Sequence, residues 1–91
     1  MILLKTEEEI EKLRASNQLV SKTLGELAKT IGPGITTRTL DKLAEDFIRD
    51  HGGIPGFLGY NAFPATLCTS LNDEVVHGIP SEYALRGGDI L

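Results

Sequence analysis

Apolar residues recur along the first half of the chain with the three- and four-residue spacing of amphipathic helices. The first stretch predicts a helix over residues 6–31, which begins at a capping box, Thr6 to Glu9, and stops at Gly32-Pro33-Gly34. Asn17 lies on its apolar stripe and is expected either to be buried and hydrogen-bonded or to mark a change of packing partner. The apolar positions that this pattern buries are Ile10, Leu13, Val20, Leu24, Leu27 and Ile31.

A second helix is predicted over residues 37–51, with Thr36 and Thr37 both suitable as N-cap. His51 precedes Gly52-Gly53 and is interpreted as a partner of the helix dipole at the C-terminal end. Its apolar stripe consists of Leu40, Leu43, Ala44, Phe47 and Ile48. The other face carries Arg38, Asp41, Lys42, Glu45, Asp46 and Arg49, and is expected to be solvated.

Residues 56–91 have a different texture, rich in glycine and proline, which favours short strands and turns over a long helix. Residues 66–71 alternate loosely and predict a strand, residues 74–77 predict a second short extended piece, and Ile90-Leu91 resembles the opening of a third. The fold class predicted from the residues is therefore α+β, within one domain.

Composition narrows the classes of partner. The chain of 91 residues carries a net charge of −4, which argues against nucleic acid or an anionic membrane as the principal partner. A single cysteine cannot form an internal disulfide, and no Cys or His pair has the spacing of a zinc site. The apolar run at the start, between Met1 and Lys5, is too short for a secretory or membrane segment, so a cytoplasmic location is expected.

The candidate chemistry lies between Tyr60 and Pro80. His77 precedes Gly78-Ile79-Pro80 and carries an imidazole, a side chain that often acts as a general acid or base, although a merely structural histidine is the commoner case. Cys68 is by default a small packed hydrophobe, and a nucleophile pair with His77 is the alternative. The remaining candidates are Tyr60, Phe63 and Phe57 as pocket or core residues, and Asn72, Asp73 and Glu74 as turn residues or cation ligands.

The residues themselves carry a resemblance. Gly59-Tyr60-x-x-Phe63-Pro64, Cys68-x-Ser70-x-Asn72-x-Glu74-Val75-x-His77-Gly78-Ile79-Pro80 and Gly88-Asp89-Ile90 closely resemble the N-terminal part of type I methionine aminopeptidases. The likeness covers residues 1–91 and implies the N-terminal portion of a pita-bread (creatinase/aminopeptidase-like) catalytic domain, with two helices followed by short antiparallel strands. The activity it implies is removal of the initiator methionine from nascent proteins.

The resemblance also implies roles for individual residues. His77 matches the histidine that contacts the substrate near the scissile amide, where an imidazole can donate to charge developing on the tetrahedral intermediate. Tyr60, Phe63 and Cys68 match positions that line the methionine side-chain pocket. Asn72 and the Glu74 backbone match positions that hold a monovalent cation in some relatives.

The family's two divalent ions (Co, Zn, Mn or Fe) are held by two Asp, one His and two Glu, all expected beyond Leu91. Asp89 matches an aspartate that is not a ligand. Residues 1–91 alone are therefore expected to be inactive and prone to self-association. The full-length enzyme is expected to be a monomer that acts close to the ribosome on chains beginning with Met and a small residue. Two alternatives are a non-catalytic pita-bread peptide-binding or interaction module and a small helical-hairpin adaptor. Aminopeptidases acting before proline fit the motif less well.

Overall fold

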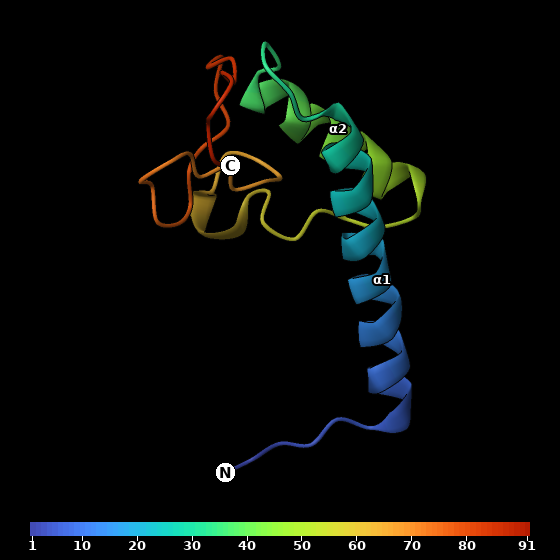
Figure 1. Cartoon of the computed structure of the whole chain (residues 1–91). Coiled ribbons are helices and arrows are strands. Elements are labelled where there is room, and N and C mark those ends of the chain that lie inside the picture. Colours follow the sequence, from blue (N-terminus) through green and yellow to red (C-terminus); the bar gives the residue numbers. More distant parts are fainter.

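Two helices form the framework of the molecule, α1 (Glu7–Thr30) and α2 (Thr37–Asp50), as Figure 1 shows. The computed structural model describes residues 1–91. Both helices agree with the predicted ranges to within one residue at each end. Thr6 and Glu9 form the reciprocal capping box, with the Glu9 N–H donating to Thr6 Oγ1 at 3.1 Å and the Thr6 N–H donating to Glu9 Oε1 at 2.9 Å.

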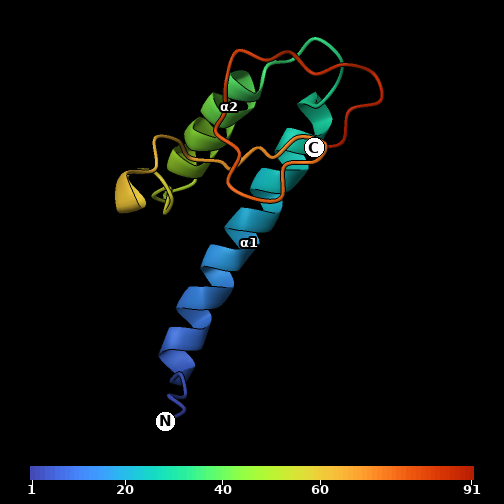
Figure 2. The same ribbon diagram turned by 90° about the vertical axis from the view of Figure 1, so that its left-hand side faces the viewer.

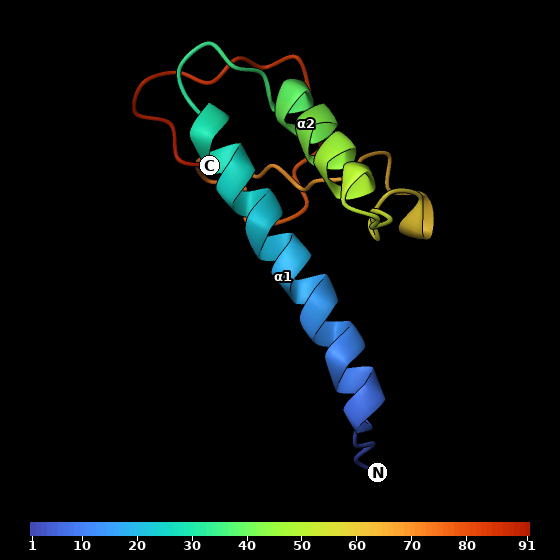
Figure 3. The same cartoon turned by 90° about the vertical axis from the view of Figure 1, so that its right-hand side faces the viewer.

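The two halves of α1 have different surroundings. Its C-terminal half packs on α2 through Thr23 and Leu27, which are buried. Its N-terminal half projects away from the other elements in every view (Figures 1 and 3). The apolar stripe predicted for this helix is largely wrong: only Leu27 is buried. The other five positions (Ile10, Leu13, Val20, Leu24 and Ile31) are between 37% and 59% exposed.

The reason is geometric. The face of α1 that meets α2 runs through Leu19, Thr23 and Leu27, four residues apart, and lies beside the stripe that hydropathy selects. Contact along that face begins only near Leu19, and Asn17 is exposed, so it is not a buried polar group. Hydropathy identified the helix correctly but not the face that packs in this structure.

The core is small and lies where α1, α2 and the segment around Leu85 meet. Leu27, Leu40, Ala44 and Leu85 are buried there. Ile35, Leu67, Leu71 and Tyr83 are partly buried and pack against this cluster. The stripe predicted for α2 is confirmed at Leu40 and Ala44, while Leu43 stays exposed.

The strands predicted for residues 66–71, 74–77 and 90–91 are absent, and beyond α2 the only regular element is a short 3-10 turn, η1 (Tyr60–Ala62). The reason lies in the partners of residues 66–71. The N–H of Leu67 donates to the Asp41 carboxylate at 2.6 Å, that of Thr69 to the Gly78 carbonyl at 2.7 Å, and that of Leu71 to the Glu74 carboxylate at 2.9 Å. Because two of these three acceptors are side chains and only the Thr69 bond goes to a backbone carbonyl, the bonds do not make a backbone ladder.

The one strand-like contact joins the α1–α2 link to the end of the chain. Thr36 and Ala84 form an isolated antiparallel bridge. It is flanked by bonds from the Gly34 N–H to the Leu85 carbonyl at 2.7 Å and from the Leu85 N–H to the Ile35 carbonyl at 2.8 Å. Figures 2 and 3 show the two segments running together above the helices. Neither helix is long and apolar enough to cross a membrane.

Candidate functional site

Three of the four residues predicted to contact substrate line one pocket. Tyr60, Phe63 and His77 surround a space of about 260 Å³ together with Phe57 and Asn61. The Phe57 ring lies edge-on to that of Phe63, with centroids 5.9 Å apart, and 6.4 Å from the His77 ring. The walls are therefore aromatic on most sides, with one imidazole as the group that can donate or accept a proton.

A tight loop brings Tyr60 and Phe63 into this pocket. The Tyr60 N–H donates to the Phe57 carbonyl at 3.0 Å, and the Phe63 N–H donates to the Tyr60 carbonyl at 2.9 Å. Asn61 and Ala62 both have positive φ, of 47° and 64°. Two successive left-handed residues turn the chain sharply, which lets side chains three positions apart face the same space. Left-handed geometry is unfavourable for alanine, so this loop carries strain.

His77 also has a left-handed backbone, with φ of 60°. The next residue, Gly78, is buried directly against the segment below it. A Cβ at Gly78 would collide with the carbonyl group of Thr69, so only glycine fits here. The Thr69 N–H donates to the Gly78 carbonyl at 2.7 Å, and the Gly78 N–H donates to Ser70 Oγ at 3.0 Å.

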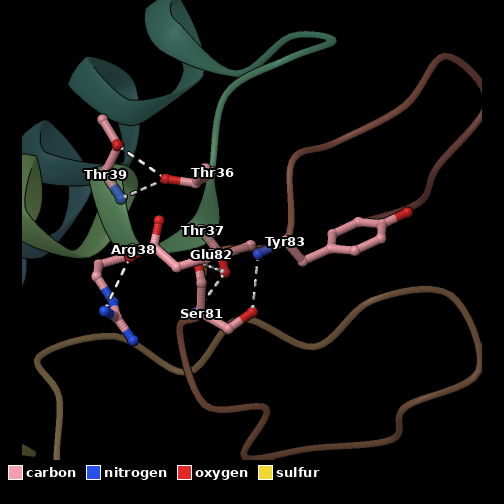
Figure 4. Close-up of polar contacts among 7 residues, drawn as sticks. All are labelled: Thr36, Thr37, Arg38, Thr39, Ser81, Glu82 and Tyr83. Atoms are coloured by element: carbon pink, nitrogen blue, oxygen red, sulfur yellow. Dashed lines mark hydrogen bonds and ion pairs between the residues drawn. The ribbon is translucent and has the colours of Figure 1, made fainter.

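The residues directly after the His77-Gly78-Ile79-Pro80 motif, Ser81 to Tyr83, are hydrogen-bonded at the start of α2 (Figure 4). The Thr37 hydroxyl accepts from the Ser81 N–H at 2.8 Å and donates to the Ser81 carbonyl at 3.2 Å. That carbonyl also accepts the Arg38 N–H at 2.9 Å, and Arg38 pairs with Glu82 at 2.8 Å on the exposed surface. The first two amides of α2, those of Thr37 and Arg38, are therefore satisfied by carbonyl groups of the residues that follow the histidine motif.

Cys68 does not line the pocket, and the structure leaves it half-buried with a free thiol. Its predicted part in methionine binding stays a prediction. His51 does not line this pocket and lies at the end of α2, as the sequence suggests. Its Nδ1 lies 2.8 Å from the Phe47 carbonyl at the end of α2, and its ring stacks on that of Phe47 with centroids 4.1 Å apart.

Asn72, predicted to hold a monovalent cation with the Glu74 backbone, is occupied in a different way. Its side-chain carbonyl accepts the Ile90 N–H at 3.0 Å, and its Nδ2 donates to Asp89 Oδ1 at 3.2 Å. Glu74 closes the turn by accepting the Leu71 N–H. The cation role therefore rests on backbone carbonyls alone and stays a prediction.

Asp89 organises this last turn. Its carboxylate accepts the Arg86 N–H at 2.9 Å and the Tyr83 hydroxyl at 2.8 Å, besides the Asn72 amide. These bonds, that of the Arg86 backbone first, lower the pKa of Asp89 below its ordinary value. The same hydroxyl bond raises the pKa of Tyr83, because it favours the protonated phenol.

No three His, Cys, Asp or Glu side chains gather at one point in the structure. Divalent metals in peptidases are held by such clusters. The residues present here therefore do not fit a divalent metal centre.

Sequence reasoning missed several residues that shape the site. Asp41 was interpreted as solvated, yet it accepts the Leu67 N–H, and Asn61 was not a candidate for the pocket. Thr37 was weighed as an N-cap, whereas Thr36 is the cap and Thr37 binds Ser81. The adjacent pair Thr36 and Thr37 was the only signal in the sequence for two separate roles. The other residues could not be found from the sequence, because the partners of long-range hydrogen bonds leave no local pattern.

Comparison with known proteins identifies the family. Residues 11–91 match the model of metallopeptidase family M24. The chain belongs to this family. The M24 match takes in α2, the aromatic pocket, His77 and Asp89, and also most of α1, so it covers every residue of the candidate site.

The individual M24 relatives are methionine aminopeptidases. The chain is 51% identical to that of Clostridium acetobutylicum over 92 residues, and 47% identical to methionine aminopeptidase 1 of Bacillus subtilis over 91 residues. These matches cover 100% of this chain and 37% of each relative. The chain thus spans little more than a third of the length of these relatives.

Solved structures give the same result for the fold. Methionine aminopeptidases from Rickettsia prowazekii (40% identity) and Thermotoga maritima (36% identity) both superpose with a TM-score of 0.94. Each match covers 98% of this chain and 36% of the solved chain. The predicted fold class is confirmed: the two helices and the irregular segments that follow are part of a pita-bread fold.

Proposed function

We propose that this chain supplies part of the substrate site of a methionine aminopeptidase, which hydrolyses the first peptide bond of proteins that begin with methionine. The observation that carries the proposal is the pocket in which His77, Tyr60 and Phe63 meet. These three residues come from two separate segments of the motif that resembles the family. Their meeting at one pocket is what a shared role in binding requires.

The chemistry of the pocket suits a methionine side chain. A thioether is polarizable, has no hydrogen to donate, and packs favourably against aromatic rings. Phe57 and Phe63 offer two such rings, in an edge-to-face pair. A slot of this kind would hold the side chain of the first residue and leave the peptide bond toward the exposed His77.

His77 is the group in the pocket that can take part in the reaction. An imidazole N–H directed at the scissile carbonyl can stabilise the negative charge that develops on its oxygen. The left-handed backbone of His77 and the bond at Gly78 fix where that ring leaves the chain. We assign His77 this donor role, with Tyr60 and Phe63 binding the methionine side chain. Cys68 lies outside this pocket and is not assigned a contact with that side chain.

Membership of family M24 implies that a divalent metal takes part in the whole enzyme. Because the residues present form no cluster for such an ion, we propose that the ligands for two divalent ions lie outside these 91 residues. On this proposal the chain does not hydrolyse peptides by itself. Nascent proteins with a small second residue are the proposed substrates, and the cytoplasm near the ribosome is the proposed place.

A chimera tests the proposal. The matching third of the Clostridium acetobutylicum enzyme is replaced by this chain, and release of methionine from Met-Ala-Ser is measured with each of Mn²⁺, Fe²⁺, Co²⁺ and Zn²⁺. We expect the chimera to be active and the 91-residue chain alone to be inactive. A folded, metal-loaded chimera without activity would contradict the proposal. If the chain nevertheless bound Met-Ala-Ser, the non-catalytic peptide-binding module would be favoured.

A further inference from the structure

We propose that Ser70 is a positioning residue for His77. The bond from the Gly78 N–H to Ser70 Oγ, at 3.0 Å, is the only hydrogen bond from a side chain to the peptide unit directly after the histidine. Ser70 does not line the pocket, so it does not touch a bound side chain there. Its effect would be exerted through the backbone of the His77-Gly78 turn.

The conformation of His77 requires such support. A residue other than glycine with φ of 60° lies in a sparsely populated region, and it stays there only where its surroundings determine the backbone. If the turn relaxed to negative φ, the imidazole would leave the chain in another direction. The ring lies 6.4 Å from that of Phe57, and this arrangement would be lost.

Two hydroxyl groups hold the turn from opposite ends. Ser70 binds Gly78, directly after His77, and Thr37 binds Ser81, which follows Pro80. The Thr37 contact comes from α2, and the Ser70 contact comes from the segment that also carries Thr69. Because Ser70 is the nearer of the two, its loss should affect His77 most directly.

Neighbouring hydroxyls on the same segment do not share this role. Thr66 Oγ1 and Thr69 Oγ1 are both buried and have no hydrogen-bond partner. If polarity alone ordered His77, removing the hydroxyl of Thr66 would loosen His77 as much as removing that of Ser70. If the Gly78 bond orders His77, only the loss of the Ser70 hydroxyl would loosen it, so Thr66 is a matched control on the same segment.

The test uses the 91-residue chain and measures the order parameter of the His77 amide by ¹⁵N relaxation. We expect a value of about 0.85 in the unmodified chain, and below about 0.6 in S70A. S70T keeps the hydroxyl and should restore the higher value, and T66V should leave it unchanged. A rigid His77 in a folded S70A chain would overturn the proposal, as would equal loosening by T66V.

A second measurement needs no substitution and decides the case if S70A does not fold. The Gly78 amide should exchange with deuterium more slowly than the amide of Val76, which donates no hydrogen bond in the structure. Equal exchange at the two amides would overturn the proposal. Slower exchange at Gly78 than at Val76 would support it.

The catalytic consequence rests on the proposed function. In the chimera with the Clostridium acetobutylicum enzyme, S70A should lower kcat by about tenfold and change KM little, because a misplaced donor affects the transition state more than the bound substrate. An inactive unmodified chimera would count against the proposed function while the relaxation result stood. An active chimera with unchanged kcat in S70A would overturn the positioning role.

Discussion

The anchored region, residues 35–44 and 81–85, and the pocket region, residues 57–77, are built in opposite ways. In the anchored region Thr37, Leu40, Ala44 and Leu85 are buried and joined by bonds across the two segments. In the pocket region Phe57, Tyr60 and His77 are exposed. Stability is therefore concentrated in one part of the molecule and candidate chemistry in the other.

Backbone strain follows the same division. All four non-glycine residues with positive φ lie in the pocket region: Asn61, Ala62, Asn72 and His77. In the α1–α2 link, Gly34 takes the positive φ, at no steric cost. Strain of this kind is typical of binding and active sites, where the surrounding structure holds an unfavourable backbone in place. The effects of substitutions on the free energy of unfolding should therefore differ in sign as well as in size between the two regions.

The largest effect is expected at Leu40, which is 1% exposed at the centre of the core. Leu40→Ala should lower the free energy of unfolding by about 2–5 kcal/mol, through lost burial and the cavity that remains. Because the core is so small, this loss should unfold much of the chain, as measured by circular dichroism in urea. Leu24→Ala, on the exposed face of α1, should change stability by less than about 0.5 kcal/mol.

Thr37→Val should have the next largest effect. It removes both bonds to Ser81 and leaves the Ser81 N–H without its partner, while the Ser81 carbonyl keeps the Arg38 N–H, so the loss should be about 1 kcal/mol in urea unfolding. Thr30→Ala serves as the control, since Thr30 is exposed and its one bond, to the Glu26 carbonyl, measures 3.5 Å. Equal costs at both positions would show that the Ser81 contact does not support the fold.

Two alanine-to-glycine substitutions compare the regions directly. Ala44 is buried inside α2, so Ala44→Gly should cost about 1 kcal/mol or more through backbone entropy and lost packing. Ala62 has φ of 64°, so Ala62→Gly should be neutral or stabilise by up to about 1 kcal/mol, because it removes left-handed strain. Destabilisation by both substitutions, measured by thermal unfolding, would mean that the pocket loop is not strained.

The smallest effect concerns acid. The pKa of the Asp89 carboxyl is lowered in the folded chain. The ionised carboxylate therefore stabilises the fold fully above its ordinary pKa of about 4, and this stabilisation is lost as the pH falls through the lowered pKa. The amides of Arg86 and Ile90 should therefore lose protection against hydrogen exchange at low pH. Asp89→Asn should lack this acid step. An identical pH profile in that variant would exclude Asp89 as its source.

Local signals in the sequence predicted local structure well. The capping box at Thr6, the glycine and proline after Thr30, and the left-handed Gly52 after α2 set both helices to within a residue. The helix signals depend only on neighbours in the chain. The pocket residues were indicated by the resemblance to methionine aminopeptidases, because Tyr60 and Phe63 lie in a different segment from His77 and no local spacing brings them together.

Features that depend on distant partners could not be predicted. Residues 66–71 have the composition of a strand, but the N–H groups of Leu67 and Leu71 bond to side chains and not to a neighbouring backbone, so no strand forms. The apolar stripe of α1 does not reveal which of two adjacent faces meets α2. The roles of Thr37, Ser70 and Asp89 arise from contacts across 44, 8 and 17 positions of the chain.

Of the two histidines in the chain, His77 and not His51 is proposed to take part in the aminopeptidase reaction. The most direct test is kcat and KM of the chimera for Met-Ala-Ser, with His77→Ala compared with His51→Ala. We predict that His77→Ala lowers kcat by about 10²-fold or more, as expected for loss of a transition-state donor, with KM little changed. His51→Ala should leave both constants close to those of the unmodified chimera. Equal kcat values in the two variants would contradict the account.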